Sequence, residues 1–409
     1  MQLLPMMAAL FGLGFANIFL RATMGVLAPE LARELSLTPA VLGATASAFF
    51  VSYALLQIPS GIVLDRFGPR DTLIATFTIT LIGTCLFATA ESAGVMLFAR
   101  LLMGAGCAAV FAAAFMLIAR FYPADRLTSV GGTMNSFAMV GTLMATAPLA
   151  ALVGVLGWRL TFAGISIGVA GVLLLVVLFV RDHPRGKVPR QTGAGESVRA
   201  MLAGSAQVLR TPGVLPLASA GIALSAGNTL LGIWGGPYLN DVHGLDPVER
   251  GTVLAAMAGA GVAGHFLYGQ AARWFNTLKW IVVVSGFAIV GLTAALALLP
   301  EASTTAVTVV FALLGLACSF PTILLAHARA LVPDHLIGRG ITTVNTGIMV
   351  AIAVMQLAVG AIIGWWTPDG AITPGVEAYQ AAFTFQCAMA AVSTLIYLRV
   401  RDCPPFARS

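Results

Sequence analysis

Two arginines interrupt apolar stretches of this chain. Arg21 lies in "FANIFLRATMGVLAP" (residues 15–29), and Arg100 opens "RLLMGAGCAA" (residues 100–109). An arginine at the centre of a membrane helix costs roughly 2.5–3.5 kcal/mol, so another group must compensate its charge. A guanidinium binds a carboxylate or phosphate through paired hydrogen bonds, which makes both arginines candidate anion-binding groups. The alternatives are that Arg21 snorkels to the outer interface and that Arg100 is structural.

Uncharged polar side chains within the apolar stretches could orient the same ligand. Asn17 lies one helical turn before Arg21, on the same face of a helix. The other candidates are Tyr53, Gln57, Asn135, Asn228, Trp234 and Asn345. Ordinary hydrogen bonds between helices are the alternative role for these side chains. His265 and His327 are candidates for proton coupling, with hydrogen-bonded packing as the alternative.

The sequence argues against enzyme chemistry and against a metal or cofactor. "GISIG" (164–168) and "GAGVAG" (259–264) match a nucleophile motif and a dinucleotide motif, but neither has the strand–turn–helix context that this chemistry requires. The five cysteines form no CxxC or Cys/His ligand spacing. Every Asp and Glu falls in a loop or at a predicted helix end, which disfavours cation/proton antiport. We therefore predict no enzyme, no metal and no cofactor.

The composition predicts an all-α membrane protein. Hydrophobic residues make up 59% of the chain and charged residues only 9%, against roughly 25% charged in soluble domains. A membrane helix takes about 20 apolar residues. The apolar runs predict twelve spans, at 6–28, 39–60, 72–90, 94–119, 127–151, 158–180, 213–235, 249–270, 278–299, 304–328, 336–363 and 378–398. The first residues lack a basic n-region, so we expect a first membrane helix and no cleaved signal.

The basic residues predict the orientation in a bacterial-type inner membrane. With both termini in the cytoplasm, the external loops hold only Arg33, Arg159 and Arg250. The basic residues of the cytoplasmic segments include Arg66, Arg70, Arg120, Arg126, Arg181, Arg185, Lys187, Arg190, Arg199, Arg210, Arg273, Lys279, Arg329, Arg339, Arg399, Arg401 and Arg408. This bias follows the positive-inside rule, so the net charge of +6 requires no nucleic-acid partner.

The chain reads as two repeated halves. A basic, polar segment at 181–212 separates a six-helix half at 1–180 from a second at 213–409. Without gaps, Pro29, Leu31, Leu37, Pro39 and Gly43 align with Pro237, Leu239, Leu245, Pro247 and Gly251. Repeats of this kind place a binding site between the halves, near the midplane of the membrane.

The short turn "GIVLDRFGPR" (61–70) and the run after Arg100 carry a family resemblance. Gly61, Asp65, Arg66, Gly68 and Arg70 fill the G-x-x-x-D-R-x-G-R-R/K pattern of the major facilitator superfamily, with Pro69 as a mild departure. Arg100, Gly104 and Gly106 resemble the R-x-x-x-G-x-G motif of its fourth helix. The resemblance implies that the turn latches the inner gate, and that helices one, four, seven and ten line the cavity.

The N-terminal stretch also resembles the organic-anion branch of that family, the anion:cation symporters. Arg21, Ala28-Pro29, Tyr53, Gln57 and Pro59 occupy the positions of its pattern, although Leu20 replaces the acid that often precedes the arginine. The resemblance implies a monomeric secondary transporter that moves a small organic anion by alternating access. Efflux of hydrophobic or drug-like compounds is the alternative function.

Overall fold

The computed structural model describes residues 3–183, 204, 206–333, 336–368 and 373–404. Within these residues the secondary structure is helical, and no strand occurs. The prediction of an all-α membrane protein is confirmed. The predicted linker at 181–212 lies largely outside the described residues.

The chain forms two compact units whose boundary is not the one that the sequence repeat suggests. Unit 1 contains Met1–Thr23 and Ala48–Met201, and unit 2 contains Met24–Ser47 and Leu202–Ser409. The segment Met24–Ser47, from the first half of the sequence, thus packs with the second half.

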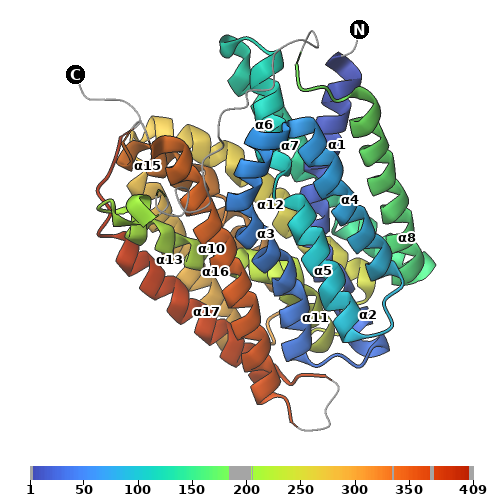
Figure 1. The fold of residues 1–409 in the computed structure, drawn as a ribbon. Coiled ribbons are helices and arrows are strands. Elements are labelled where there is room, and N and C mark those ends of the chain that lie inside the picture. The colour runs from blue at the N-terminus through green and yellow to red at the C-terminus, as the bar shows by residue number, and fades with distance from the viewer. Residues whose placement is uncertain (1–2, 184–203, 205, 334–335, 369–372, 405–409) are drawn as a thin grey trace. The chain divides into compact units, whose positions relative to one another are not determined.

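Unit 1 is built from helices that pack side by side. They are α1 (Leu3–Ala22), the larger part of α3 (Pro39–Phe67), α4 (Pro69–Ala88), α5 (Ala93–Cys107), α6 (Val110–Phe121), α7 (Ala124–Met144) and α8 (Ala147–Phe179). Helix α4 packs against α5 and α8, and α1 packs against α7 (Figure 1).

Glycines allow the close contact between α4 and α5. A Cβ atom on Gly83 would lie 2.9 Å from the carbonyl oxygen of Ala99, and one on Gly106 would collide with the Thr76 carbonyl and the Thr80 hydroxyl. Small residues let membrane helices approach until their backbones touch. Gly106 of the family-like motif therefore has a packing role in this interface.

Unit 2 contains α2 (Met24–Glu34) and the helices of the second half. These are α10 (Val214–Thr229), the π-helical turn η1 (Leu230–Trp234), α11 (Gly235–Asp241), α12 (Pro247–Trp274), α13 (Lys279–Leu298), α14 (Thr304–Ala317), α15 (Pro321–Leu331), α16 (Ile337–Trp366) and α17 (Val376–Tyr397). Helix α13 packs against α17, α12 against α14, and α10 against both α16 and α17 (Figure 1).

Ten helical segments of the described chain are long and apolar enough to cross a membrane. Helix α17 coincides with the predicted span 378–398, and α7 covers most of the predicted span 127–151, but neither is among these ten. The predicted spans 127–151 and 158–180 meet inside α8, where Gly157 has a φ of 72° and breaks the helical path. The sequence located the division, and a left-handed glycine produces it.

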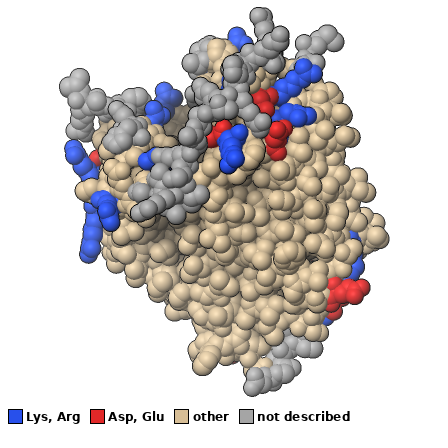
Figure 2. All heavy atoms as spheres, in the orientation of Figure 1, with Lys and Arg blue, Asp and Glu red and all other residues tan. Residues whose placement is uncertain are grey.

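The surface along the helices is apolar. Exposed side chains include Leu160 at 64%, Ile167 at 75% and Val284 at 67% exposure. On the face in Figure 2, charged side chains gather near helix ends. Among the residues that are not drawn in grey, the surface between these ends shows no charged side chain. An apolar surface of this extent on a folded chain is expected where lipid is the solvent.

One carboxylate fixes the C-terminal segment to the start of α13. Asp402 accepts hydrogen bonds from the Thr277 hydroxyl at 2.6 Å and from the backbone N–H groups of Leu278 and Lys279 at 3.1 and 3.0 Å. Partial burial alone would raise the pKa of Asp402, but these hydrogen bonds outweigh it and lower the pKa below its ordinary value. The carboxylate therefore stays ionised and caps the helix N-terminus.

We expect Gly106→Ala to destabilise unit 1. The added methyl group has no space between α5 and α4, and overpacking of this kind costs about 1–3 kcal/mol. The melting temperature of the detergent-purified protein should fall. Gly94→Ala, at a position where a Cβ meets nothing within 4 Å, is the matched control and should melt like the unchanged protein. Equal melting of both variants would contradict this packing role.

Candidate functional site

Unit 1 brings together Asn17, Arg21, Tyr53 and Arg100, a group that we call the arginine site. Helix α1 contributes Asn17 and Arg21, α3 contributes Tyr53, and α5 contributes Arg100. The positions are far apart in the sequence, so only the packing of the three helices creates the group.

Arg100 is buried, with 1% of its surface exposed. Its Nη1 donates to the carbonyl oxygen of Leu20 at 2.9 Å, and its guanidinium lies 4.9 Å from the centre of the Phe49 ring. Its Nε and Nη2 atoms are buried without a hydrogen-bond partner, and the ion pairs found among the described residues do not include it. Arg100 thus has unused donors in a place where unused donors are costly.

Arg21 lies against the same group of aromatic rings. Its guanidinium is 5.0 Å from the centre of the Tyr53 ring and 5.7 Å from that of Phe50. Phe49 contacts both of these rings, at centroid distances of 6.3 Å to Tyr53 and 5.6 Å to Phe50. Cation–π contacts compensate part of a guanidinium charge, and more strongly where water is excluded.

Asn17 completes the polar lining. Its side-chain amide donates to the carbonyl oxygen of Cys107 at 2.8 Å, and its Oδ1 is buried without a partner. The side chain is fully buried. This bond holds α1 close to the end of α5, so Asn17 positions the helix that carries Arg21.

The arrangement is suited to an anion. Two guanidiniums sit on one aromatic cluster, where they repel each other. By sequence, every carboxylate of unit 1 lies at or beyond a helix end. A planar carboxylate could accept paired hydrogen bonds from the free donors of Arg100. The aromatic residues Phe49 and Phe50 were not among the predicted site residues, although their spacing from Tyr53 on one helix was visible in the sequence.

The remaining predicted polar residues are distributed over both units. In unit 1, Gln57 and Asn135 are half-buried on α3 and α7. In unit 2, Asn228 donates to the Leu224 carbonyl of its own helix at 3.3 Å, and Asn345 is half-buried on α16. Trp234 ends the π-helical turn, and its buried Nε1 has no hydrogen-bond partner.

Both candidate histidines of unit 2 have hydrogen-bond partners. His265 Nδ1 lies 2.8 Å from the Gly261 carbonyl of its own helix. The buried His327 lies 2.8 Å from both the Tyr397 hydroxyl and the Arg401 carbonyl. Because a carbonyl only accepts, His327 Nε2 carries a proton, and in the neutral ring Nδ1 then accepts from the Tyr397 hydroxyl. These contacts match the packing role that was the alternative for both residues.

The turn after α3 is fixed through Arg70. Its backbone N–H donates to Asp182 Oδ1 at 2.9 Å, and its guanidinium donates to the Val180 and Val177 carbonyls, each at 2.9 Å. Gly68 has a φ of 82°, which favours glycine. Gly61 lies half-buried within α3, whereas Asp65 and Arg66 near the end of this helix are exposed. Within unit 1, Arg70 thus binds the turn to the end of α8. The exposed Asp65 takes no part in these hydrogen bonds.

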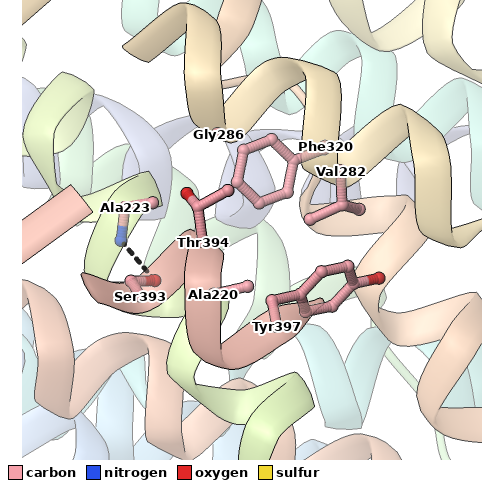
Figure 3. A pocket seen from close by; sticks show the side chains of 8 residues that line it. All are labelled: Ala220, Ala223, Val282, Gly286, Phe320, Ser393, Thr394 and Tyr397. Atoms are coloured by element: carbon pink, nitrogen blue, oxygen red, sulfur yellow. Dashed lines mark hydrogen bonds between the residues drawn. The ribbon is translucent and has the colours of Figure 1, made fainter. Parts of the chain in front are cut away.

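A small pocket in unit 2 is separate from this chemistry. Ala220, Ala223, Phe320, Ser393 and Tyr397 are among its lining residues (Figure 3). The Ser393 hydroxyl accepts from the Ala223 N–H at 3.3 Å and donates to the Ser219 carbonyl at 2.7 Å. Its polar groups are therefore occupied, and the pocket is a packing gap.

Several relatives of this chain are named as transporters of organic anions. The chain is 26% identical to a putative tartrate transporter of Agrobacterium vitis, over 85% of this chain and 83% of that protein. It is 30% identical to a probable sulfoacetate transporter of Cupriavidus necator, but that match covers 40% of this chain and 38% of the relative. Further relatives are named as transporters of sugar acids, so the resemblance to the organic-anion branch is confirmed.

The fold also has solved counterparts. A bacterial homolog of the human lysosomal transporter Spinster matches with a TM-score of 0.77 and 18% identity, over 96% of this chain and 95% of that one. Because the relatives are transporters, the prediction that the chain is not an enzyme is confirmed. The family model of the Major Facilitator Superfamily matches residues 10–325, and the chain belongs to this superfamily of transporters.

Proposed function

We propose that this transporter moves a small organic anion, a carboxylate in the first instance, by alternating access. The observation that carries the proposal is the buried guanidinium of Arg100, whose Nε and Nη2 have no hydrogen-bond partner. An unused charged donor in a membrane helix is retained where a ligand can use it. The tartrate and sulfoacetate names of two relatives support the same class of substrate.

In this proposal the arginine site binds the anionic group. Arg100 supplies the free donors, Arg21 adds a second positive charge beside Tyr53, and Asn17 offers an acceptor for a substrate hydroxyl. Direct contact with two guanidiniums would distinguish an anion from a neutral compound by several kilocalories per mole, since like-charge repulsion is relieved only by an anion. The polar residues Gln57, Asn135, Asn228, Trp234 and Asn345 remain candidates for further contacts.

The orientation is part of the proposal. We propose that both termini lie in the cytoplasm of a bacterial-type cell, which the excess of Arg and Lys in one set of loops supports, and that the protein acts as a monomer. The primary experiment is a binding screen of the purified protein against mono- and dicarboxylates, sulfonates, phosphates and neutral hydrophobic compounds. Stabilisation by neutral compounds alone would favour efflux instead.

Arg21→Gln should weaken binding of the anion found in that screen. Truncating one partner of a buried charge pair costs about 2–5 kcal/mol, which calorimetry on the purified protein resolves. Arg21→Lys keeps the charge but loses the planar fork, so its binding should recover only partly. Arg399→Gln, at an exposed position, is the control and should bind normally. Normal binding and transport by Arg21→Gln would reduce Arg21 to a snorkelling residue.

Arg100→Gln separates a binding role from a structural one. If its unused donors serve the substrate, the variant should bind the anion more weakly by about 2–5 kcal/mol. The melting temperature of the empty protein should change little, because the substitution removes a buried charge that has no ion-pair partner. A large fall in melting temperature with unchanged anion affinity would assign Arg100 to structure.

Asp65→Asn should affect transport and leave binding intact. Asp65 is exposed on the turn that we propose as the cytoplasmic gate, whereas the buried Arg100 and the half-buried Arg21 lie on other helices. Conformational steps limit the rate of many proteins that cycle between states. We therefore expect slower uptake into proteoliposomes and nearly unchanged affinity in detergent. A large loss of equilibrium affinity would place Asp65 in the binding site.

A further inference from the structure

The turn between α12 and α13, residues 273–280, is the second-half counterpart of the turn at 65–72, and we call them the second turn and the first turn. The ungapped alignment of the two halves sets Gly68 opposite Asn276. Both residues have a left-handed backbone, with φ values of 82° and 47°. A positive φ is uncommon outside glycine, so the shared conformation indicates that the same turn is built twice.

Each turn is also held by a carboxylate beyond the end of a later helix. In unit 1, Asp182, after α8, accepts a hydrogen bond from the Arg70 N–H at 2.9 Å. In unit 2, Asp402, after α17, accepts from the N–H groups of Leu278 and Lys279. The alignment sets Arg70 opposite Leu278. The two turns therefore have similar anchors, and their side chains can be compared position by position.

The side chains of the two turns differ in charge. The alignment sets Asp65 opposite Arg273, and Asp71 opposite Lys279. The first turn holds two acids and two arginines, so its formal charge is zero. The second turn holds one arginine, one lysine and no acid, so its formal charge is +2. The acids that balance the first turn are replaced by bases in the second.

The cations of the second turn are not compensated by the part of the protein that the structure describes. There, the side chains of Arg273 and Lys279 make no ion pair or hydrogen bond, and Lys279 contacts the Trp280 ring at 5.4 Å. The segment that carries Asp402 adds the exposed and likewise unpaired Arg401. The second turn thus offers positive charge to a partner outside the described protein.

Large aromatic side chains accompany these cations. Trp274, Phe275 and Trp280 are 73%, 72% and 54% exposed. At the other end of unit 2, where α16 ends, Trp365 and Trp366 are also exposed (Figure 1). Tryptophan is enriched where the hydrocarbon of a membrane meets the headgroups. The two sets of aromatic side chains are therefore expected at the two surfaces of the membrane.

Charge distinguishes these two ends of unit 2. Residues 367–377, which follow α16, contain two acids and no base, whereas the second turn contains two bases and no acid. Aromatic side chains suit the boundary of any bilayer. Cations that lack a protein partner favour a lipid whose headgroup carries a net negative charge.

We propose that the second turn, together with Arg401, binds the headgroup of an anionic phospholipid. Arg273 and Lys279 donate hydrogen bonds to the phosphodiester, and the three exposed aromatic side chains lie against the glycerol and the upper acyl chains. In the orientation proposed above, this lipid belongs to the cytoplasmic leaflet. The site lies within unit 2 and is independent of the transported anion.

Quenching of tryptophan fluorescence by brominated phospholipids tests the site. The chain has six tryptophans. In a background with Trp365→Phe and Trp366→Phe, the remaining ones are the buried Trp158 and Trp234 and the two of the second turn. Bromine on the acyl chains then reports on the second turn. The full-length protein is reconstituted into mixed bilayers of phosphatidylglycerol and phosphatidylcholine, with bromine on one lipid or on the other.

We expect phosphatidylglycerol to bind beside the second turn about fivefold more strongly than phosphatidylcholine, the effect of one basic residue near a charged membrane surface. Arg273→Gln with Lys279→Gln should lower this ratio to about one. Arg273→Asp with Lys279→Asp, which installs the acids of the first turn, should lower it below one. Each variant is compared with itself in the two bilayers, so a change in its intrinsic fluorescence cancels.

Arg33→Gln is the control, because it removes an exposed cation of α2 and should leave the ratio unchanged. Replacing chloride by inorganic phosphate at constant ionic strength should also leave it unchanged. Loss of the preference in phosphate would identify a site for free phosphate and would overturn the lipid site.

Equal binding of the two lipids beside the unchanged turn would overturn the proposal. A preference that survives both double variants would do the same, and so would a preference that Arg33→Gln abolishes, since it would then belong to the overall charge. No substrate is added, and both leaflets contain both lipids. Failure of the anion proposal or of the proposed orientation would therefore leave these ratios unaffected.

Discussion

A charged group in the hydrocarbon region of a membrane must be compensated by the protein itself, because lipid offers no hydrogen bonds. This constraint explains the arginine site. Arg100 uses one donor on the Leu20 carbonyl and lies over the Phe49 ring, yet two of its nitrogen atoms remain without a partner. The aromatic rings of α3 compensate the guanidiniums only in part, which leaves the site complementary to an anion. Unit 1 owes its proposed chemistry to this incomplete compensation.

The same constraint explains why glycine is used so often where helices meet. Apolar side chains gain little by leaving lipid for one another, so helices associate through close packing and hydrogen bonds. Gly83 and Gly106 bring α4 against α5 within unit 1, and Gly43 with Gly360 bring α3 against α16 within unit 2. Beside Gly360, within unit 2, the side-chain amide of Gln356 and the Trp234 Nε1 atom are buried without a hydrogen-bond partner among the described residues.

The pairing of Glu30 with Arg250 could not be predicted from the sequence. Both were assigned to loops or helix ends outside the membrane, where a charge needs no explanation. The structure instead buries Arg250 and gives it Glu30 as partner across more than two hundred positions of the chain. No local pattern links the two residues, because an ion pair between distant helices depends on how the helices pack. The same holds for Phe49, whose contact with Arg100 is decided by the position of α5 beside α3.

The class of the protein could be predicted from the amino-acid sequence alone. The number of apolar residues, the turn at 61–70 and the two arginines in apolar runs were enough to predict a helical membrane transporter of this superfamily, because membrane helices are specified locally by composition and length. The predicted spans 127–151 and 158–180 also left a division within α8, where the structure has Gly157 with a φ of 72°. The grouping of Asn17, Arg21, Tyr53 and Arg100 is seen in the tertiary structure and had no local pattern in the sequence. The same is true of the packing of Met24–Ser47 with the second half. These are contacts between residues far apart in the chain, and their energy exists only once the helices have packed.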